Sequence, residues 1–152
     1  MALDAIDRNI LNLLQANGRM TNADLAERVH LSQSACLRRV RSLEAQGVID
    51  RYVALIDPAK IGRRSIVFVE ITVASQSDEV LSAFEAAVRQ VPDVMECHLM
   101  SGDADYLLLV MAADVEDYAR IHKDHLARLP GVSRVHSSFV LRTVSKTTVH
   151  PM

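Results

Sequence analysis

Apolar positions recur at helical spacing through the first third of the chain. Over residues 3–14 they repeat about every 3.6 residues, with charged side chains on the opposite side, and Asn17-Gly18 is a helix-ending signal. A second amphipathic helix is predicted to begin after Thr21, whose hydroxyl can cap it. A third is predicted within residues 32–47. The pattern therefore predicts three short helices, with a tight connection between the second and the third.

The pattern changes at residue 48. Residues 48–57 (VIDRYVALID) are rich in β-branched side chains and roughly alternate between apolar and polar positions, which is typical of a strand or hairpin. Pro58 and Gly62 end this segment. Three helices followed by a β-ribbon predict a winged helix-turn-helix domain over residues 1–62.

From residue 66 onward the chain alternates between strand and helix patterns in the order β-α-β-β-α-β. The strands are predicted at residues 66–74, 94–100, 106–113 and 132–144, and the helices at residues 77–90 and 114–129. A faint internal repeat relates the two halves, because VPDVMECH follows the first helix and LPGVSRVH follows the second. Two βαβ halves predict a ferredoxin-like domain over residues 63–152, which gives the whole chain an α+β class.

One predicted strand is unusually apolar. Residues 106–113 (YLLLVMAA) carry too few polar side chains for a strand with one face in water, so both faces are expected to be covered. The helices of the same domain would cover one face. The sheet of a second subunit is the expected cover for the other face, which predicts a homodimer.

Charge is divided unevenly along the chain. The net charge is -2, but residues 1–64 carry 10 Lys and Arg against 7 Asp and Glu, whereas residues 65–152 carry 7 against 12. A basic front half joined to an acidic back half favours two modules, of which the first binds a polyanion. No apolar run reaches the roughly 18 residues that span a bilayer, and no signal peptide is apparent, so a cytoplasmic protein is expected.

The third predicted helix carries the candidate DNA-binding chemistry. Ser34, Arg38 and Arg41 are spaced so that they share one face, and a helix of this size fits the major groove, where arginine can bind guanine in bidentate fashion. Arg39 is ambiguous, because it could contact phosphate or fix the helix through a salt bridge. A solvated basic helix face is the simpler alternative. The predicted DNA-contacting residues are Thr21, Asn22, Ser32, Gln33, Ser34, Arg38, Arg39 and Arg41.

The segment MSGDADYLLLV, residues 100–110, has two interpretations. Gly and Asp are turn-forming residues, so a plain β-turn between two strands explains it. Alternatively, Gly102 lets a ligand approach the backbone, whose exposed groups can bind a carboxylate, while an acidic side chain accepts from an ammonium group. A free amino acid carries both a carboxylate and an ammonium group, so its binding site needs a partner for each.

Three stretches together resemble one family. They are residues 3–49 (LDAIDRNILNLLQANGRMTNADLAERVHLSQSACLRRVRSLEAQGVI), MSGDADYLLLV, and SSFVL at residues 137–141. In order, spacing and length they are similar to the leucine-responsive regulatory protein/AsnC family of transcription regulators, also called feast/famine regulators. The resemblance covers nearly the whole chain.

This resemblance implies an N-terminal domain that binds double-stranded DNA and a ferredoxin-like domain that senses an amino acid. It also implies homodimers that assemble into octamers, and leucine, methionine or a similar amino acid as effector. A neighbouring subunit is expected to complete the effector site. The resemblance brings forward as effector-binding candidates Ser101, Gly102, Asp103, Asp105 and Tyr106, with Ser137 and Ser138 as weaker ones.

Other chemistries have weak support. His122 and His125 share a predicted helix, but two ligands without a third are poor evidence of a metal site. Cys36 and Cys97 form neither a disulfide framework nor a zinc site. With no phosphate-binding loop, dinucleotide fingerprint or nucleophile elbow in the sequence, no catalytic residue, metal or cofactor is predicted. Two alternatives stay open: an architectural DNA-organising protein and, more distantly, a small ferredoxin-like enzyme.

Overall fold

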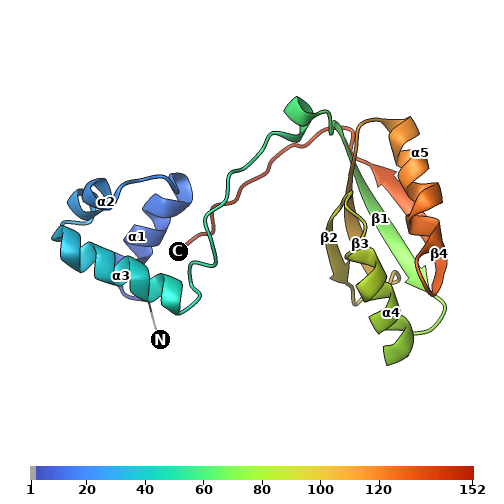
Figure 1. Ribbon diagram of the computed structural model, residues 1–152, viewed down its shortest axis with the longest axis horizontal. Helices are drawn as coiled ribbons and strands as arrows, with labels where there is room; N and C mark the ends of the chain where they lie inside the picture. Colours follow the sequence, from blue (N-terminus) through green and yellow to red (C-terminus); the bar gives the residue numbers. More distant parts are fainter. Residues whose placement is uncertain (1–2) are drawn as a thin grey trace. The chain divides into compact units, whose positions relative to one another are not determined.

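The computed structural model describes residues 3–152 and divides the chain into two compact units. One unit contains the residues up to Leu55 together with Ser145–Met152, and the other contains Ile56–Val144 (Figure 1). The chain therefore passes from one unit to the other twice. The boundary predicted at residue 62 lies inside the second unit, and the C-terminal residues join the first unit.

The first unit is built on three helices, α1 (Ala5–Ala16), α2 (Asn22–Arg28) and α3 (Gln33–Ala45). Each begins at a side-chain cap: Asp4 accepts from the backbone of Asp7, Thr21 from Asp24 and Ser32 from Ala35. The three predicted helices are confirmed. Their apolar faces meet in a core that contains Ile10, Leu11, Leu25, Ala26, Val29, Cys36 and Leu43.

The C-terminal residues of the chain contact α1. Gln15 Nε2 donates to the carbonyl oxygen of His150 at 3.2 Å, and the backbone N–H of His150 donates to Gln15 Oε1 at 2.6 Å. One side-chain amide thus pairs with both backbone groups of one residue, as a neighbouring strand would. The pattern of the sequence gives no sign of this contact.

The β-ribbon predicted over residues 48–57 does not form within one chain. The segment is extended but forms no strand, and it is followed by the 3-10 helix η1 (Pro58–Ile61). Val53 and Leu55 are 66% and 72% exposed, so the apolar side chains of the segment have little to pack against. A hairpin needs a second strand and a tight turn, and this stretch contains no turn-forming dipeptide.

The second unit is a four-stranded antiparallel sheet with two helices. In chain order its elements are β1 (Ser65–Val73), α4 (Asp78–Val88), β2 (Val94–Leu99), β3 (Tyr106–Ala112), α5 (Val115–Asp124), the 3-10 helix η2 (Leu126–Arg128) and β4 (Val132–Phe139). The strands lie in the order β2-β3-β1-β4. The predicted β-α-β-β-α-β order is confirmed, although β4 ends at Phe139, five residues before the predicted end of that strand at residue 144.

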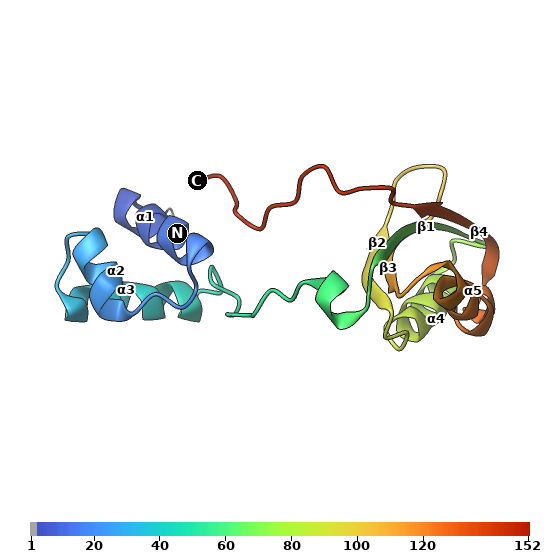
Figure 2. The same ribbon diagram turned by 90° about the horizontal axis from the view of Figure 1, so that it is seen from above.

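The two faces of this sheet differ. Both helices cover the same face (Figure 2), and every second residue of β3 faces the core beneath them, so that Tyr106, Leu108, Val110 and Ala112 are buried. On the other face Phe68 is 43% exposed, and the intervening β3 residues are only partly covered. We call this second surface the open sheet face. The expectation that both faces of residues 106–113 are covered therefore fails within one chain, and a covering subunit stays a prediction.

No helix among the described residues is long and apolar enough to cross a membrane.

Candidate functional sites

The start of α3 is held by side chains of the preceding turn. Ser32 caps the helix, and its hydroxyl lies 3.2 Å from that of Ser34. Asn22 Nδ2 donates to the carbonyl oxygen of Gln33 at 2.9 Å, which ties the first turn of α2 to the first turn of α3. Thr21 donates its hydroxyl proton to the Asp24 carboxylate at 2.6 Å. Of the predicted DNA contacts, Asn22 thus joins the two helices, whereas Thr21 caps α2.

The face of α3 predicted to bind DNA is exposed. Ser34, Arg38 and Arg41 are all exposed, whereas Cys36 and Leu43, on the other side of the helix, are buried in the three-helix core. Among the described residues, no ion pair involves Arg38 or Arg41. Two guanidinium groups on one exposed helix face are therefore available to an anionic or guanine-bearing partner.

Arg39 is different, because it binds two carboxylates of α1. Its Nη1 lies 2.7 Å from Asp4 Oδ2 and 2.8 Å from Asp7 Oδ1. The backbone N–H of Asp7, followed by the Arg39 guanidinium, lowers the pKa of Asp4, and the hydrogen bond to Asp4 raises the pKa of Arg39. Of the two roles considered for Arg39, this geometry favours the salt bridge, which pins α3 to the first turn of α1.

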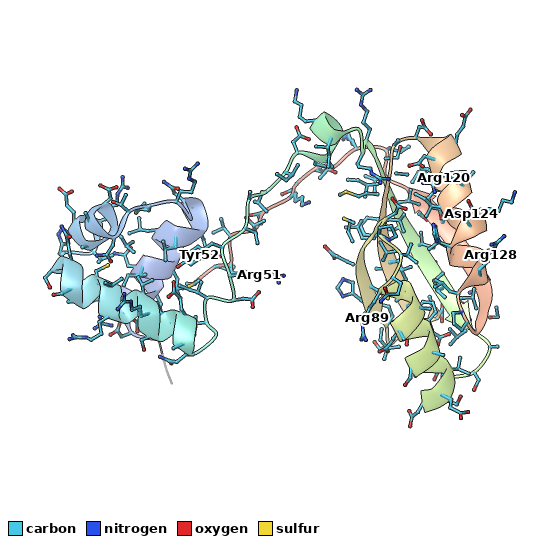
Figure 3. All side chains as sticks on the ribbon, viewed as in Figure 1. Arg51, Tyr52, Arg89, Arg120, Asp124 and Arg128 are labelled. Atoms are coloured by element: carbon cyan, nitrogen blue, oxygen red, sulfur yellow. The ribbon has the colours of Figure 1, made fainter. Side chains whose placement is uncertain are left out.

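Tyr52 fixes the segment that leaves α3. Its hydroxyl donates to Glu44 Oε1 at 3.0 Å, and burial, followed by the Glu44 carboxylate, raises the pKa of Tyr52 to about 12. Figure 3 labels Tyr52 next to Arg51, whose Nε pairs with Asp50 at 3.3 Å. Sequence reasoning missed the role of Tyr52, since a tyrosine in a predicted strand indicates packing rather than anchoring.

The loop between β2 and β3 is shaped by Asp105. This residue is 7% exposed; its Oδ2 accepts from the backbone N–H of Val73 at 2.8 Å and its Oδ1 from Gln76 Nε2 at 2.6 Å. Its own N–H donates to the carbonyl oxygen of Ile71 at 2.9 Å. The carboxylate is therefore occupied by its own chain. A structural role explains Asp105 better than the predicted contact with an effector.

Tyr106 and Ser137 also face away from the loop. Tyr106 is 1% exposed, packs on Phe84 with ring centroids 4.3 Å apart, and donates to Glu85 Oε1 at 2.9 Å. Burial, followed by the Glu85 contact, raises the pKa of Tyr106. The Ser137 hydroxyl is hydrogen-bonded to that of Tyr118 on α5. The structure thus places both residues on the helix-covered side of the sheet, apart from the predicted effector loop.

A cavity lies on the open sheet face beside this loop. It has a volume of about 350 Å³ and is lined by Glu70, Met100, Gly102, Asp103, Ala104, Leu107 and Arg134. An added Cβ at Gly102 would meet no heavy atom within 4 Å, so the backbone there is open to a ligand. Of the predicted effector residues, Gly102 and Asp103 line the cavity. Ser101 is exposed in the same loop, and Ser138 is exposed on β4 opposite Phe68.

The cavity carries charges of both signs. Arg134 supplies the cation, from β4, while Asp103 and Glu70 supply carboxylates, and Glu70 Oε2 lies 2.9 Å from His136 Nδ1. Met100 and Leu107 provide apolar wall. Sequence reasoning missed Arg134 and Glu70. They are 64 residues apart and come together only because β1 pairs with β4, with Glu70 opposite His136 and Thr72 opposite Arg134.

Among the described residues there is no group of three or more His, Cys, Asp or Glu side chains that could hold a metal ion. His122 lies near the Tyr118 ring, with centroids 6.2 Å apart. Cys36 is buried, and burial raises the pKa of the half-buried Cys97 thiol to about 11. The thiols are therefore poor nucleophiles at neutral pH.

Residues 66–150 match the Lrp/AsnC ligand binding domain, and residues 3–50 match a winged helix-turn-helix DNA-binding domain. The chain belongs to the Lrp/AsnC family of transcription regulators. The leucine-responsive regulatory protein of Salmonella typhimurium is 45% identical over 145 residues, which cover 95% of this chain and 88% of that protein. The protein of the same name from Escherichia coli K12 is 44% identical over the same shares.

Solved structures of Lrp/AsnC proteins share the fold. A transcriptional regulator from Neisseria meningitidis in complex with L-methionine is 37% identical, with a TM-score of 0.94 over 99% of this chain and 97% of that chain. An AsnC family regulator from Agrobacterium tumefaciens is 41% identical, with a TM-score of 0.93 over 98% of this chain and 97% of that chain. The predicted family, the α+β class and the role as a DNA-binding transcription regulator are confirmed. The contact residues stay predictions.

Proposed function

We propose that this Lrp/AsnC regulator binds pseudo-palindromic DNA through α3 and takes a small apolar amino acid in the cavity on its open sheet face. The proposed amino-acid binding rests on the cavity itself, which combines one cation and two carboxylates with apolar side chains. The Neisseria meningitidis relative and a feast or famine regulatory protein from Mycobacterium tuberculosis, 34% identical, were both solved with L-methionine.

The DNA contact is assigned to the exposed side of α3. Arg38 and Arg41 would reach base edges or phosphates, and Gln33 and Ser34 lie at the N-terminal end of the helix, which enters the major groove first in this class of domain. Thr21 and Ser32 cap α2 and α3, and Asn22 joins the two helices. All three are proposed to contact phosphate groups beside the groove. Arg39 acts by holding the helix in place.

The amino acid is expected to bind by charge and shape. Its carboxylate would pair with Arg134, whose guanidinium can donate two parallel hydrogen bonds, and its ammonium group with Asp103 or Glu70. Its side chain would pack on Met100 and Leu107, which favours methionine or leucine over a polar amino acid. The open sheet face is proposed to pair with a second subunit, and dimers to assemble further, so that neighbouring chains complete the site.

Regulation would follow from a coupling between the two sites. An effector that favours one arrangement of subunits changes the spacing of their α3 helices, and so the affinity for a two-part DNA site. Such couplings are typically about 1–3 kcal/mol. An architectural DNA-organising protein is the competing function. A regulator should bind its site at least ~10³-fold tighter than random DNA, and a purely architectural protein should not.

A thermal-shift titration with L-methionine and L-leucine tests the effector site. A ligand at 100 times its dissociation constant should stabilise the protein by roughly 2.7 kcal/mol. Gly102→Asp should abolish this shift, because the new side chain fills the cavity and brings a negative charge to the carboxylate, while the open space around Gly102 leaves the fold intact.

Ser82→Asp is the matched control, since it adds the same charge at an exposed position of α4, outside the cavity lining. A shift that survives in Gly102→Asp and in Arg134→Gln would place the effector elsewhere. No shift with any common amino acid at millimolar concentration would remove amino-acid sensing from the proposal.

A further inference from the structure

The second unit is acidic overall, yet its carboxylates are missing from one end. Residues 56–144 contain nine Lys and Arg against thirteen Asp and Glu, a net charge of -4. No Asp or Glu occurs from Pro58 to Val69, or from His125 to the C-terminus. The chain enters β1 through the first of these segments and leaves β4 through the second. Positive charge is therefore concentrated where the two segments meet.

Several cations in these segments lack a carboxylate partner, and three of them lie just before β1 or just after β4. Lys60, Arg64 and Arg142 are exposed, and among the described residues no ion pair involves them. The neighbouring Arg63 differs, because its Nη1 lies 2.7 Å from Asp93 Oδ1 and 3.4 Å from Asp117 Oδ2. Arg63 thus holds its segment against the rest of the second unit, which fixes where Lys60 and Arg64 are displayed.

The pairing of β1 with β4 brings two of these cations together. Val67 lies opposite Phe139, and the N–H of Val140 donates to the carbonyl oxygen of Ile66 at 2.9 Å, just beyond the end of β4. In Figure 1 the start of β1 lies beside the end of β4. Arg64 and Arg142 each lie two residues beyond this last backbone hydrogen bond, on the two segments that leave the same end of the sheet.

Like charges held near one another repel, unless an anion lies between them. A linear polyanion fits this arrangement well. Duplex DNA carries about one negative charge per 1.7 Å of its axis, and each arginine can bind a phosphate through two hydrogen bonds. The unit that displays these cations is covalently joined to the unit that binds DNA, so DNA bound by α3 is present at high local concentration.

We infer that Lys60, Arg64 and Arg142 form a second DNA contact, which binds the phosphate backbone next to the site read by α3. This inference rests on the proposed DNA-binding function and extends it to the unit that binds the effector. The contact adds affinity without base recognition, because phosphates carry no sequence information directly. It strengthens specific and random DNA binding alike, and it makes both more dependent on salt.

The test compares two charge-neutralised full-length proteins with the parent chain. One carries Arg64→Gln and Arg142→Gln. The control carries Lys123→Gln and Arg128→Gln, which remove the same charge from α5 and η2 of the same unit, where ion pairs likewise involve neither residue among those described. Figure 3 labels Arg128 beside Arg120 and Asp124, along α5. DNA affinity is measured as a function of KCl on a long duplex.

Each phosphate contact contributes about 0.9 to the slope of log affinity against log salt. The Arg64 and Arg142 variant is expected to lose about 1.8 from this slope, on specific and random duplexes alike, while the control keeps the parent slope. An unchanged slope in the first variant overturns the inference, as does an equal loss in both variants. A change in assembly state with no change in slope would assign the arginine pair to a protein interface and also overturn it. If the parent chain binds duplex DNA without salt dependence, the proposed function itself fails.

Discussion

At the scale of single residues, Arg38 and Arg39 show how neighbouring side chains on one helix acquire different roles. Successive residues point about 100° apart around a helix axis, as its 3.6-residue turn requires. Arg38 therefore points to solvent, while Arg39 reaches Asp4 and Asp7 at the start of α1. Arg38 is therefore available to a binding partner, whereas Arg39 is paired within the fold.

Alanine substitutions should separate these roles. Arg38→Ala is expected to weaken specific DNA binding by about 1–3 kcal/mol, the size of one good base contact, with an unchanged melting temperature and unchanged amino-acid affinity. Arg39→Ala should instead lower the melting temperature, because it leaves the nearly buried Asp7 carboxylate without its cation. Thermal unfolding and DNA titration of both variants check this contrast. If the Arg39→Ala protein melts at the parent temperature but fails to bind DNA, Arg39 contacts DNA directly.

Local signals made part of this residue picture predictable. The caps at Thr21 and Ser32 follow from residue type and position alone, as does the exposed face that contains Arg38 and Arg41. The role of Arg39 depends on carboxylates more than thirty residues away in the chain. These carboxylates approach Arg39 only in the folded chain, so the sequence alone does not decide between a salt bridge and a phosphate contact for this residue.

At the scale of elements, the loop between β2 and β3 depends on a carboxylate that does not line the cavity. Asp105 joins the start of β3 to the end of β1 and to the connection that leads to α4, through Val73 and Gln76. Asp103, two residues earlier, is exposed and lines the cavity. Of the two acidic residues of the loop, Asp105 therefore holds the structure, and Asp103 is left for the proposed binding site.

Asp105→Ala should destabilise the protein by about 1–3 kcal/mol, because the Val73 N–H is left buried without an acceptor. Asp103→Ala should leave stability unchanged and weaken amino-acid binding. Urea unfolding followed by circular dichroism gives the first quantity, and calorimetric titration with L-methionine gives the second. An Asp105→Ala protein that is as stable as the parent chain but no longer binds L-methionine would show that Asp105 belongs to the effector site.

The pattern of apolar and polar residues predicted most of the strands and helices, but it did not predict which strands pair with one another. Alternation along β1 and the apolar run of β3 are visible in the sequence, and both strands are present. The β-ribbon does not form within one chain, because residues 48–57 have strand-like composition but no neighbouring strand to pair with. Arg134 and Glu70 were missed for a related reason: sheet pairing brings them to one cavity, and local patterns do not encode register.

At the scale of the whole molecule, the two units are joined by two passages of the chain. One passage follows Leu55, and the other precedes Ser145, after which the C-terminal residues return to α1 through Gln15 and His150. Two covalent segments therefore connect the second unit to the DNA-binding unit. The family match makes both units part of one regulator, and the proposed coupling between its two binding events can be measured.

Coupling of this kind must be reciprocal, and this gives a whole-molecule prediction. If saturating L-methionine changes the DNA dissociation constant by some factor, saturating DNA must change the L-methionine dissociation constant by the same factor, which is typically about 5–150. Both constants should be measured at one protein concentration, so that the assembly state is the same in each titration. Gly102→Asp provides the control, because it should bind DNA with the parent affinity and show no response to L-methionine.

A factor of one in both directions, with both ligands bound, would mean that the effector cavity and α3 are energetically independent. The amino acid would then stabilise the protein without regulating it. A factor that is lost when Gln15→Ala releases the C-terminal residues would instead show that the second passage carries the coupling. The same pair of titrations therefore tests whether sensing reaches the DNA and which of the two segments transmits it.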